Sequence, residues 1–107
     1  MACCGIVQEF PCKLQRESRI LNFSFRDELP PGVIITGLRP VIVEMLACKD
    51  DDPYSIMKGP IGLSEDGKVA QFPVDDGVKG ATYQFTVEVE RSGGEEPAMI
   101  VAYMGVV

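Results

Sequence analysis

The sequence predicts an all-β fold, an immunoglobulin-like antiparallel β-sandwich of about seven strands with an N-terminal arm. Three observations lead to this prediction. The chain has 107 residues, which is the usual size of one domain. Apolar residues alternate with polar ones in several short runs, which is the periodicity of half-buried strands. Turn-forming residues separate these runs, with 11 Gly and 8 Pro in the chain, and no run shows sustained helical periodicity.

The N-terminal residues show no clean periodicity. We therefore expect residues 1–18 to form an N-terminal arm or an edge segment, and residues 19–107 to form the immunoglobulin-like domain.

Seven candidate strands follow in order, at residues 20–25, 33–36, 38–46, 62–65, 69–74, 82–91 and 99–107. In the first of them, Leu21, Phe23 and Phe25 share one face, while Asn22 and Ser24 lie on the other. This alternation predicts a strand with one buried face. A turn rich in Asp, Glu and Pro separates it from the short second strand.

The third candidate strand is β-branched and apolar, as expected for a strand within a sandwich. Val41, Val43 and Met45 lie on one of its faces. A turn-rich segment at residues 50–60 precedes the short fourth strand. Residues 65–68 (Glu-Asp-Gly-Lys) then predict a hairpin into the fifth strand.

The clearest alternation in the chain belongs to the sixth candidate strand, which places Tyr83, Phe85, Val87 and Val89 on one face. Thr, Gln and Glu residues occupy its other face, which we expect to meet water. A Ser- and Gly-rich hairpin leads into the last strand. The predicted core consists of Leu21, Phe23, Val41, Val43, Phe72, Tyr83, Phe85, Val87 and Ile100.

Residues 76–85 match the pattern of a tyrosine corner, in which a Tyr at the start of the penultimate strand bonds back to upstream backbone. Tyr83 is the candidate residue, and Phe85 follows it on the same face. The alternative is that Tyr83 is simply a core aromatic. Both interpretations are structural.

The composition limits the classes of partner. The net charge is −6 and no cluster of Lys and Arg is present, so we expect no direct binding to nucleic acid. No stretch is apolar enough to span a membrane, and the N-terminus lacks the basic region of a secretory signal. The acidic runs, such as Asp50–Asp52, are expected to be solvated turns; a divalent-cation loop is the alternative.

The residue types argue against an enzyme. His is absent, so neither a Ser-His nor a Cys-His nucleophile pair can be built. No Asp or Glu occupies a core-facing strand position, where burial would raise its pKa. The glycines at 59 and 62 lack the Lys and Ser/Thr of a phosphate-binding loop. We therefore expect neither catalytic residues nor a cofactor.

Four cysteines are the unusual feature of the sequence: Cys3, Cys4, Cys12 and Cys48. Reduced thiols are the simplest expectation, and one or two disulfides are a second possibility whose pairing the sequence does not select. The same four residues are weak candidates for a thiolate metal site, because paired C-x-x-C ligand motifs are missing.

The order of features from residue 13 onward resembles a family of small immunoglobulin-like proteins encoded among the virion genes of tailed bacteriophages and prophages. The resemblance rests on an alternating strand, a turn ending in Gly, an Ile-rich strand, a Gly-x-x-Gly-x-x-Tyr corner and a Ser-Gly hairpin. These pieces are residues 21–25, 27–32, 33–36, 77–83 and 91–94. The cysteine-bearing arm departs from the pattern.

This resemblance implies a non-enzymatic structural protein made in the host cytoplasm and located in the virion. It would be a capsid decoration or cement protein, or a neck or tail subunit. Its partners would be other virion proteins (major capsid, neck or tail proteins), bound in multiple symmetric copies. We expect contacts through the arm or through exposed strand edges, since an unpaired edge can accept a neighbouring strand.

Two other functions stay open. One is a carbohydrate- or surface-binding immunoglobulin-like module, for which Tyr54 and Tyr103 are the only plausible exposed aromatic residues. The other is a metal or redox domain based on the four cysteines.

Overall fold

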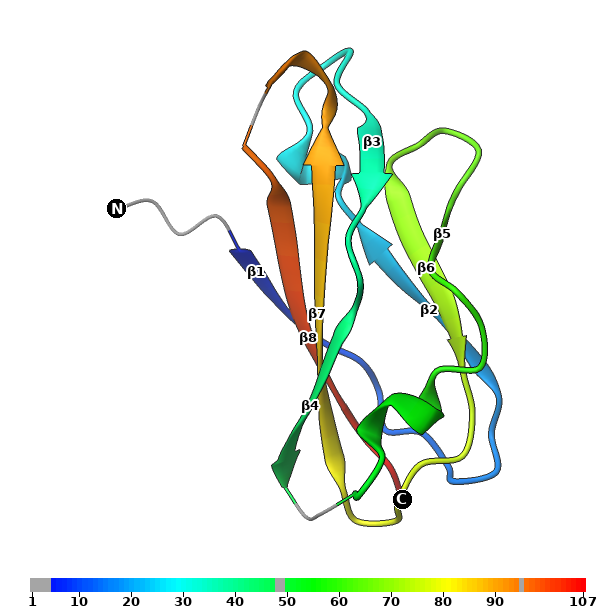
Figure 1. The fold of residues 1–107 in the computed structure, drawn as a ribbon. Helices are drawn as coiled ribbons and strands as arrows, with labels where there is room; N and C mark the ends of the chain where they lie inside the picture. Colours follow the sequence, from blue (N-terminus) through cyan, green and yellow to red (C-terminus); the bar gives the residue numbers. More distant parts are fainter. Residues whose placement is uncertain (1–4, 48–49, 95) are drawn as a thin grey trace.

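Two β-sheets pack face to face (Figure 1), and the computed structural model describes residues 5–47, 50–94 and 96–107. One sheet has five strands and the other has three, so the predicted all-β sandwich is confirmed. The five-stranded sheet contains β1 (Gly5–Glu9), β8 (Ala98–Gly105), β7 (Thr82–Arg91), β3 (Ile35–Leu38) and β4 (Ile42–Ala47). The three-stranded sheet contains β2 (Arg19–Ser24), β6 (Val69–Val74) and β5 (Gly62–Leu63).

The core lies between the sheets and is formed by the strand faces that the alternation predicted. Every residue of the predicted core is buried, with at most 7% of its surface exposed. Aromatic rings link the two sheets: Phe23 stacks on Phe72 at 5.4 Å, and Phe72 lies 5.6 Å from Phe85 across the sandwich. The outward side chains of β7 and β8 alternate with these buried ones.

The position of the break between β3 and β4 differs from the prediction. The sequence predicts separate strands at 33–36 and 38–46, whereas β3 ends at Leu38 and β4 begins at Ile42. Pro40 explains the break, because proline has no backbone N–H to donate. Both strands pair with β7, and the Arg39 N–H still donates to the Glu88 carbonyl at 3.1 Å. Together they occupy one strand position of the sandwich.

The N-terminal segment is an edge strand. β1 pairs with β8 in parallel, which departs from the antiparallel pairing of the other strands. Further hydrogen bonds extend this pairing: the Phe10 N–H donates to Tyr103, and the Lys13 N–H donates to Gly105. The Gln15 N–H then donates to the Val107 carbonyl at 3.0 Å. Residues 5–15 are therefore attached to the body along much of their length.

Short 3₁₀ turns connect several strands: η1 (Arg26–Glu28), η2 (Pro53–Ile56) and η3 (Ser92–Gly94). The sequence indicated only turns at these places, although Ile56 of η2 is fully buried in the core. The predicted hairpin between β5 and β6 is confirmed, with Gly67 at a φ of 69°. In the described part of the chain, no helix is long and apolar enough to cross a membrane.

Candidate functional site

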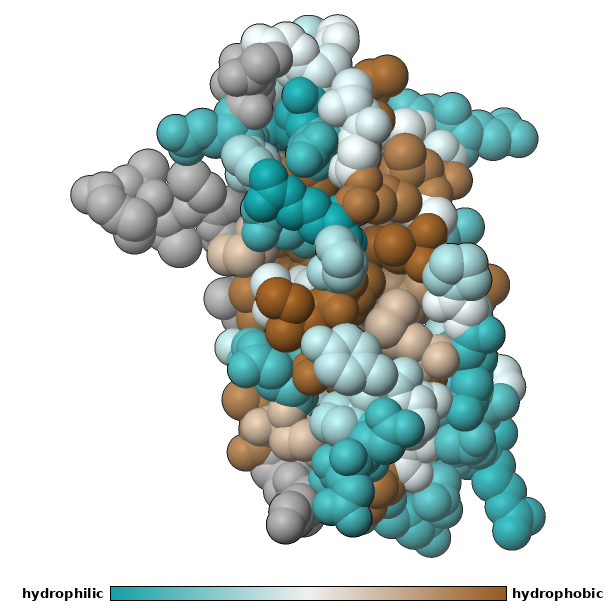
Figure 2. Space-filling view, viewed as in Figure 1, coloured by the Kyte–Doolittle hydropathy of each residue, from teal (hydrophilic) through white to brown (hydrophobic). Residues whose placement is uncertain are grey.

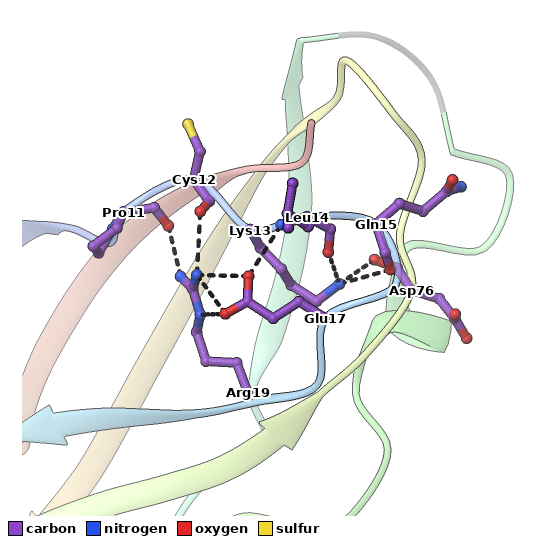
Figure 3. A network of polar contacts seen from close by, with 8 residues as sticks. All are labelled: Pro11, Cys12, Lys13, Leu14, Gln15, Glu17, Arg19 and Asp76. Atoms are coloured by element: carbon purple, nitrogen blue, oxygen red, sulfur yellow. Dashed lines mark hydrogen bonds and ion pairs between the residues drawn. The ribbon is translucent and has the colours of Figure 1, made fainter.

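A buried lysine anchors a polar network where the N-terminal segment meets the loop between β6 and β7 (Figure 3). Lys13 has no solvent-exposed surface. Its Nζ donates to the carbonyl oxygens of Leu14 at 2.9 Å, Gln15 at 3.0 Å and Asp76 at 2.7 Å. Three acceptors match the three N–H groups of an ammonium group. The buried charge is thus fully satisfied by backbone oxygens.

The charge of Lys13 is balanced between burial and nearby carboxylates. Desolvation lowers the pKa of Lys13, while Asp75, Asp76 and Glu17 act in the opposite direction. An amine that attacks a substrate needs a free lone pair and room for the reacting carbon. Because each N–H of Lys13 points at a carbonyl and the side chain is enclosed, the arrangement is suited to holding two segments together.

Arg19, at the start of β2, is a second anchor for the same segment. Its guanidinium donates to the carbonyl oxygens of Pro11 at 2.6 Å and Cys12 at 3.1 Å. It also forms an ion pair with Glu17 at 3.0 Å. The hydrogen bond from Arg19, followed by one from the Leu14 N–H, lowers the pKa of Glu17. Figure 3 shows these groups converging below residues 11–14.

The loop between β6 and β7 supplies the other half of the network. The Ser18 hydroxyl donates to the Asp75 carboxylate at 2.8 Å and lowers the pKa of Asp75. The Gln15 side chain donates to the Gly77 carbonyl at 3.1 Å. Gly77 has a φ of +95°, and a Cβ there would lie 3.0 Å from Val106. The tight approach of loop and C-terminal strand therefore requires glycine.

The tyrosine corner predicted from the sequence is present. The Tyr83 hydroxyl accepts a hydrogen bond from the Val78 N–H at 2.8 Å, five residues upstream. It also donates to the Asp50 carboxylate at 2.5 Å, a partner that the sequence did not indicate. Burial, followed by the bond to Asp50, raises the pKa of Tyr83 to about 12. The ring itself is fully buried, so Tyr83 is both corner and core residue.

The sequence candidates for metal binding are only partly described. Cys3, Cys4 and Cys48 lie outside the described residues. Cys12 is exposed, and its Sγ would lie 3.3 Å from a Cβ placed on Gly105. Within residues 5–47, 50–94 and 96–107, no group of three or more His, Cys, Asp or Glu residues could hold a metal ion.

The acidic run at residues 50–52 is tied into its own turn. The Asp50 carboxylate accepts hydrogen bonds from Tyr83 and, at 2.9 Å, from the Asp52 N–H. Asp50 thus closes the tyrosine corner, and Asp51 and Asp52 are exposed. The geometry matches the solvated turn rather than the cation loop, which needs alternating oxygen ligands around one point.

The surface has only shallow depressions among the described residues, and part of it is apolar. Two open depressions have volumes of about 320 and 390 Å³; one is bordered by Ile20 and Pro73, the other by Leu14 and Val107. Figure 2 shows apolar side chains gathered over the middle of one side, near β3 and β4, with hydrophilic side chains towards the lower end. The exposed large apolar residues are Leu14, Ile20, Ile34, Ile42, Leu46, Tyr54, Leu63, Val78 and Val107.

The two aromatic residues that sequence reasoning singled out for sugar binding lie on different elements. Tyr54 is 50% exposed on η2, whereas Tyr103 is partly buried on the outward side of β8. No protein-family model matches the chain, and no significant match was found among curated proteins or solved structures.

Proposed function

We propose that this chain is a non-enzymatic structural component of a tailed-phage virion, either a capsid decoration or cement protein or a neck or tail subunit. It binds other virion proteins and is present in multiple symmetric copies. The proposal takes its particle type from the family resemblance in the sequence. Its physical support comes from the way in which polar and apolar groups are distributed over the fold.

The observation that carries the proposal is the contrast between saturated polar groups and exposed apolar ones. In the described part of the chain, no buried side-chain nitrogen or oxygen lacks a hydrogen-bond partner. The most buried ionisable groups, Lys13 and Tyr83, both form hydrogen bonds with the backbone of the loop before β7. Aliphatic side chains such as Ile42 and Leu46, by contrast, are about half exposed. Reactive sites need poised polar groups, whereas binding surfaces need exposed apolar ones.

The edges of the sheets offer further binding surface. Among the described strands, β2 pairs only with β6 and β4 pairs only with β7, so each presents an outer row of backbone groups. No backbone hydrogen bond from elsewhere in the described chain covers residues 20–24 or 42–46. Such edges can accept a strand from a neighbouring protein. The N-terminal segment offers less binding surface to a partner protein than an unattached arm would, because Lys13 and Arg19 hold it against the body.

Purified particles provide the test. Virions from a lysogen or phage that encodes this chain would be banded on a density gradient, and their proteins quantified by mass spectrometry. We expect the chain to sediment with the particles at a fixed ratio to the major capsid protein. Deleting its gene should alter particle stability or completeness. Absence of the chain from banded particles would rule the proposal out.

A further inference from the structure

The described chain contains two Asp-Gly pairs, and they lie in different loops. Asp66-Gly67 is in the hairpin between β5 and β6, and Asp76-Gly77 is in the loop between β6 and β7. An Asp followed by Gly is a sequence at which a protein chain can rearrange to isoaspartate, because glycine has no side chain to shield its backbone nitrogen. Both pairs share this intrinsic chemistry, so their surroundings decide which of them reacts.

The rearrangement consumes and returns only water and a proton. The backbone nitrogen of the glycine attacks the carboxyl carbon of the Asp side chain. A C–N bond forms, and one carboxyl oxygen leaves as water with the amide proton and a proton from solvent, which gives a succinimide ring. Water then opens the ring at the former main-chain carbonyl. That carbonyl becomes a free carboxylate, a proton returns to solvent, and the peptide link now runs through the side chain.

The surroundings of Asp66-Gly67 restrain both reacting groups. The Gly67 N–H donates to the Ser64 carbonyl at 3.0 Å. The Asp66 carboxylate accepts hydrogen bonds from the Ser64 hydroxyl at 2.6 Å and from the Lys68 N–H at 3.2 Å. It also forms an ion pair with Arg26. Ring closure at this pair must break these contacts first, and their loss opposes the reaction.

The surroundings of Asp76-Gly77 leave both reacting groups available. Within residues 5–47, 50–94 and 96–107, the Gly77 N–H donates no hydrogen bond. The Asp76 carboxylate is paired with the Lys58 ammonium at 3.4 Å, and both side chains are exposed, so this pair is weak. Asp76 also has a φ of 58°, which places a residue with a Cβ in the left-handed region. The loop therefore holds Asp76 in a backbone conformation that costs free energy.

Lys13 activates the nitrogen of this second pair. Its Nζ donates to the Asp76 carbonyl at 2.7 Å (Figure 3). That carbonyl and the Gly77 N–H belong to the same amide group, so negative charge develops on the carbonyl oxygen when the nitrogen loses its proton. A buried ammonium group in contact with this oxygen stabilises the developing charge. The Gly77 nitrogen is therefore a better nucleophile than an ordinary backbone nitrogen.

Lys13 also favours the product of the rearrangement. Opening of the ring turns the carbonyl that Lys13 contacts into a carboxylate. The ammonium group then has an ionised acceptor in place of a neutral one, and charge-assisted hydrogen bonds of this kind are the stronger ones. The same side chain thus acts on the attacking nitrogen and on the group that is formed.

We propose that Asp76-Gly77 is a site of self-modification, at which the folded chain converts Asp76 to isoaspartate while Asp66-Gly67 stays unchanged. The site is independent of the proposed virion function, because it requires only the folded chain and water. It also gives Lys13 a chemical role besides that of an anchor.

Site-resolved measurement of isoaspartate in the full chain tests the proposal. The folded chain is kept at neutral pH for several weeks and digested at mildly acidic pH, and electron-transfer fragmentation then distinguishes isoaspartate from aspartate. Labelling by a protein-isoaspartate methyltransferase with S-adenosylmethionine gives a second measure. We expect isoaspartate to form at least about tenfold faster at position 76 than at position 66, because the contacts of Asp66-Gly67 must open first. In guanidinium chloride the two rates should agree within about threefold, because the unfolded chain has lost these contacts.

Three variants separate the chemistry from general loosening of the loop. Asp76→Glu should remove the signal at position 76, because Glu would have to close a larger ring. Asp66→Glu is the matched control and should leave that signal unchanged. Lys13→Met should slow the reaction at position 76 by at least about threefold and leave position 66 unaffected, because the stabilising charge is lost.

Each alternative result has a definite meaning. Isoaspartate that forms no faster at position 76 than at position 66 of the folded chain would overturn the proposal, and so would its absence from both positions. Signal at position 76 that persists in Asp76→Glu would show that another group is being detected. A Lys13→Met variant that reacts as fast as wild type would overturn the activation by Lys13.

Discussion

The Nζ atom of Lys13 lies 2.7 Å from the carbonyl oxygen of Asp76, and this hydrogen bond joins the N-terminal edge strand to the loop before β7. The two residues are 63 positions apart in the sequence. Two further carbonyl oxygens, from Leu14 and Gln15, complete the shell around the ammonium group. The N-terminal segment is therefore part of the folded unit, and its attachment should depend on Lys13 together with the second anchor, Arg19.

Lys13→Met tests this dependence. Methionine has a similar length but cannot donate to the three carbonyl oxygens, which all lose this partner. We expect the free energy of unfolding to fall by about 1–3 kcal/mol, measured by urea denaturation. Amide exchange along β1 should accelerate as well. Lys79→Met, at an exposed position, is the control and should change stability by less than about 0.5 kcal/mol. Equal stability of the two variants would show that Lys13 does not hold the segment.

Tyr83→Phe tests the corner and its dependence on pH. The variant removes the partner of the Val78 N–H and one of the two partners of the Asp50 carboxylate, and we expect a loss of about 1–3 kcal/mol at neutral pH. Because the pKa of Tyr83 is raised from 10.0 to about 12, the unfolded chain releases this proton first as the pH rises.

The stabilising effect of the Tyr83 proton is therefore complete below about pH 10 and is lost as the pH rises towards 12. The difference in unfolding free energy between wild type and Tyr83→Phe should shrink by about 2 kcal/mol over this interval. Absorbance at the tyrosinate band should also lose its step near pH 12 in the variant. A difference that is constant from neutral to alkaline pH would contradict the raised pKa.

The stability of the folded chain at acidic pH should depend on Asp75. The hydrogen bond from Ser18 lowers the pKa of Asp75 in the folded chain. The ionised Asp75 carboxylate therefore stabilises the folded chain fully at pH values above the ordinary carboxyl pKa. This stabilisation is lost as the pH falls from about 4 through the lowered value. In Ser18→Ala, the unfolding free energy should therefore decline less steeply below about pH 4 than in wild type. Urea denaturation at several acidic pH values measures this slope, and identical slopes would count against the bond.

Phe85→Ala tests the predicted facing of the longest strand. Phe85 is fully buried between Phe72 and Tyr83, with ring centroids 5.6 and 6.4 Å away. Removing the ring leaves a cavity between the two sheets, and we expect a loss of about 3–5 kcal/mol in denaturant unfolding. Ile20→Ala is the control at an exposed strand position. A loss below about 1 kcal/mol for Phe85→Ala would mean that the core tolerates its removal.

Strand faces could be predicted from the sequence because alternation is a local signal. In β7, four apolar residues recur at every second position, and all four are fully buried. The tyrosine corner was predictable for the same reason, since Tyr83 and Val78 are only five residues apart. The break at Pro40 was also visible in the sequence, but the prediction broke the chain at Gly37 and continued the next strand from residue 38 to residue 46 through Pro40.

The contacts that build the Lys13 network could not be predicted in this way. The parallel pairing of β1 with β8 joins the two ends of the chain, and no local pattern specifies it. A lysine in a segment without periodicity is normally expected in solvent. Its burial becomes favourable only once the loop carrying Asp76 is placed beside it. The link between Asp50 and Tyr83 is non-local as well, across 33 positions.

Gly77→Ala tests the close approach that brings this loop onto the C-terminal strand. Two penalties combine at this position: a φ of +95°, which L-residues rarely adopt, and a Cβ only 3.0 Å from Val106 and 3.1 Å from Ile56. Gly32→Ala is a matched control, because its φ of +82° is similar but nothing lies within 4 Å of the added Cβ. We expect Gly32→Ala to cost about 1 kcal/mol from backbone strain alone.

Gly77→Ala should cost at least about 1–2 kcal/mol more than this control, because buried side chains must also shift. It should also weaken the Lys13 contact, since the Asp76 carbonyl precedes Gly77 directly. Amide exchange of residues 5–15 should therefore increase in Gly77→Ala but not in Gly32→Ala. Equal losses of stability in the two variants would show that only the backbone conformation matters. In that case the packing of Val106 and Ile56 against the loop would not contribute to the attachment of the N-terminal strand.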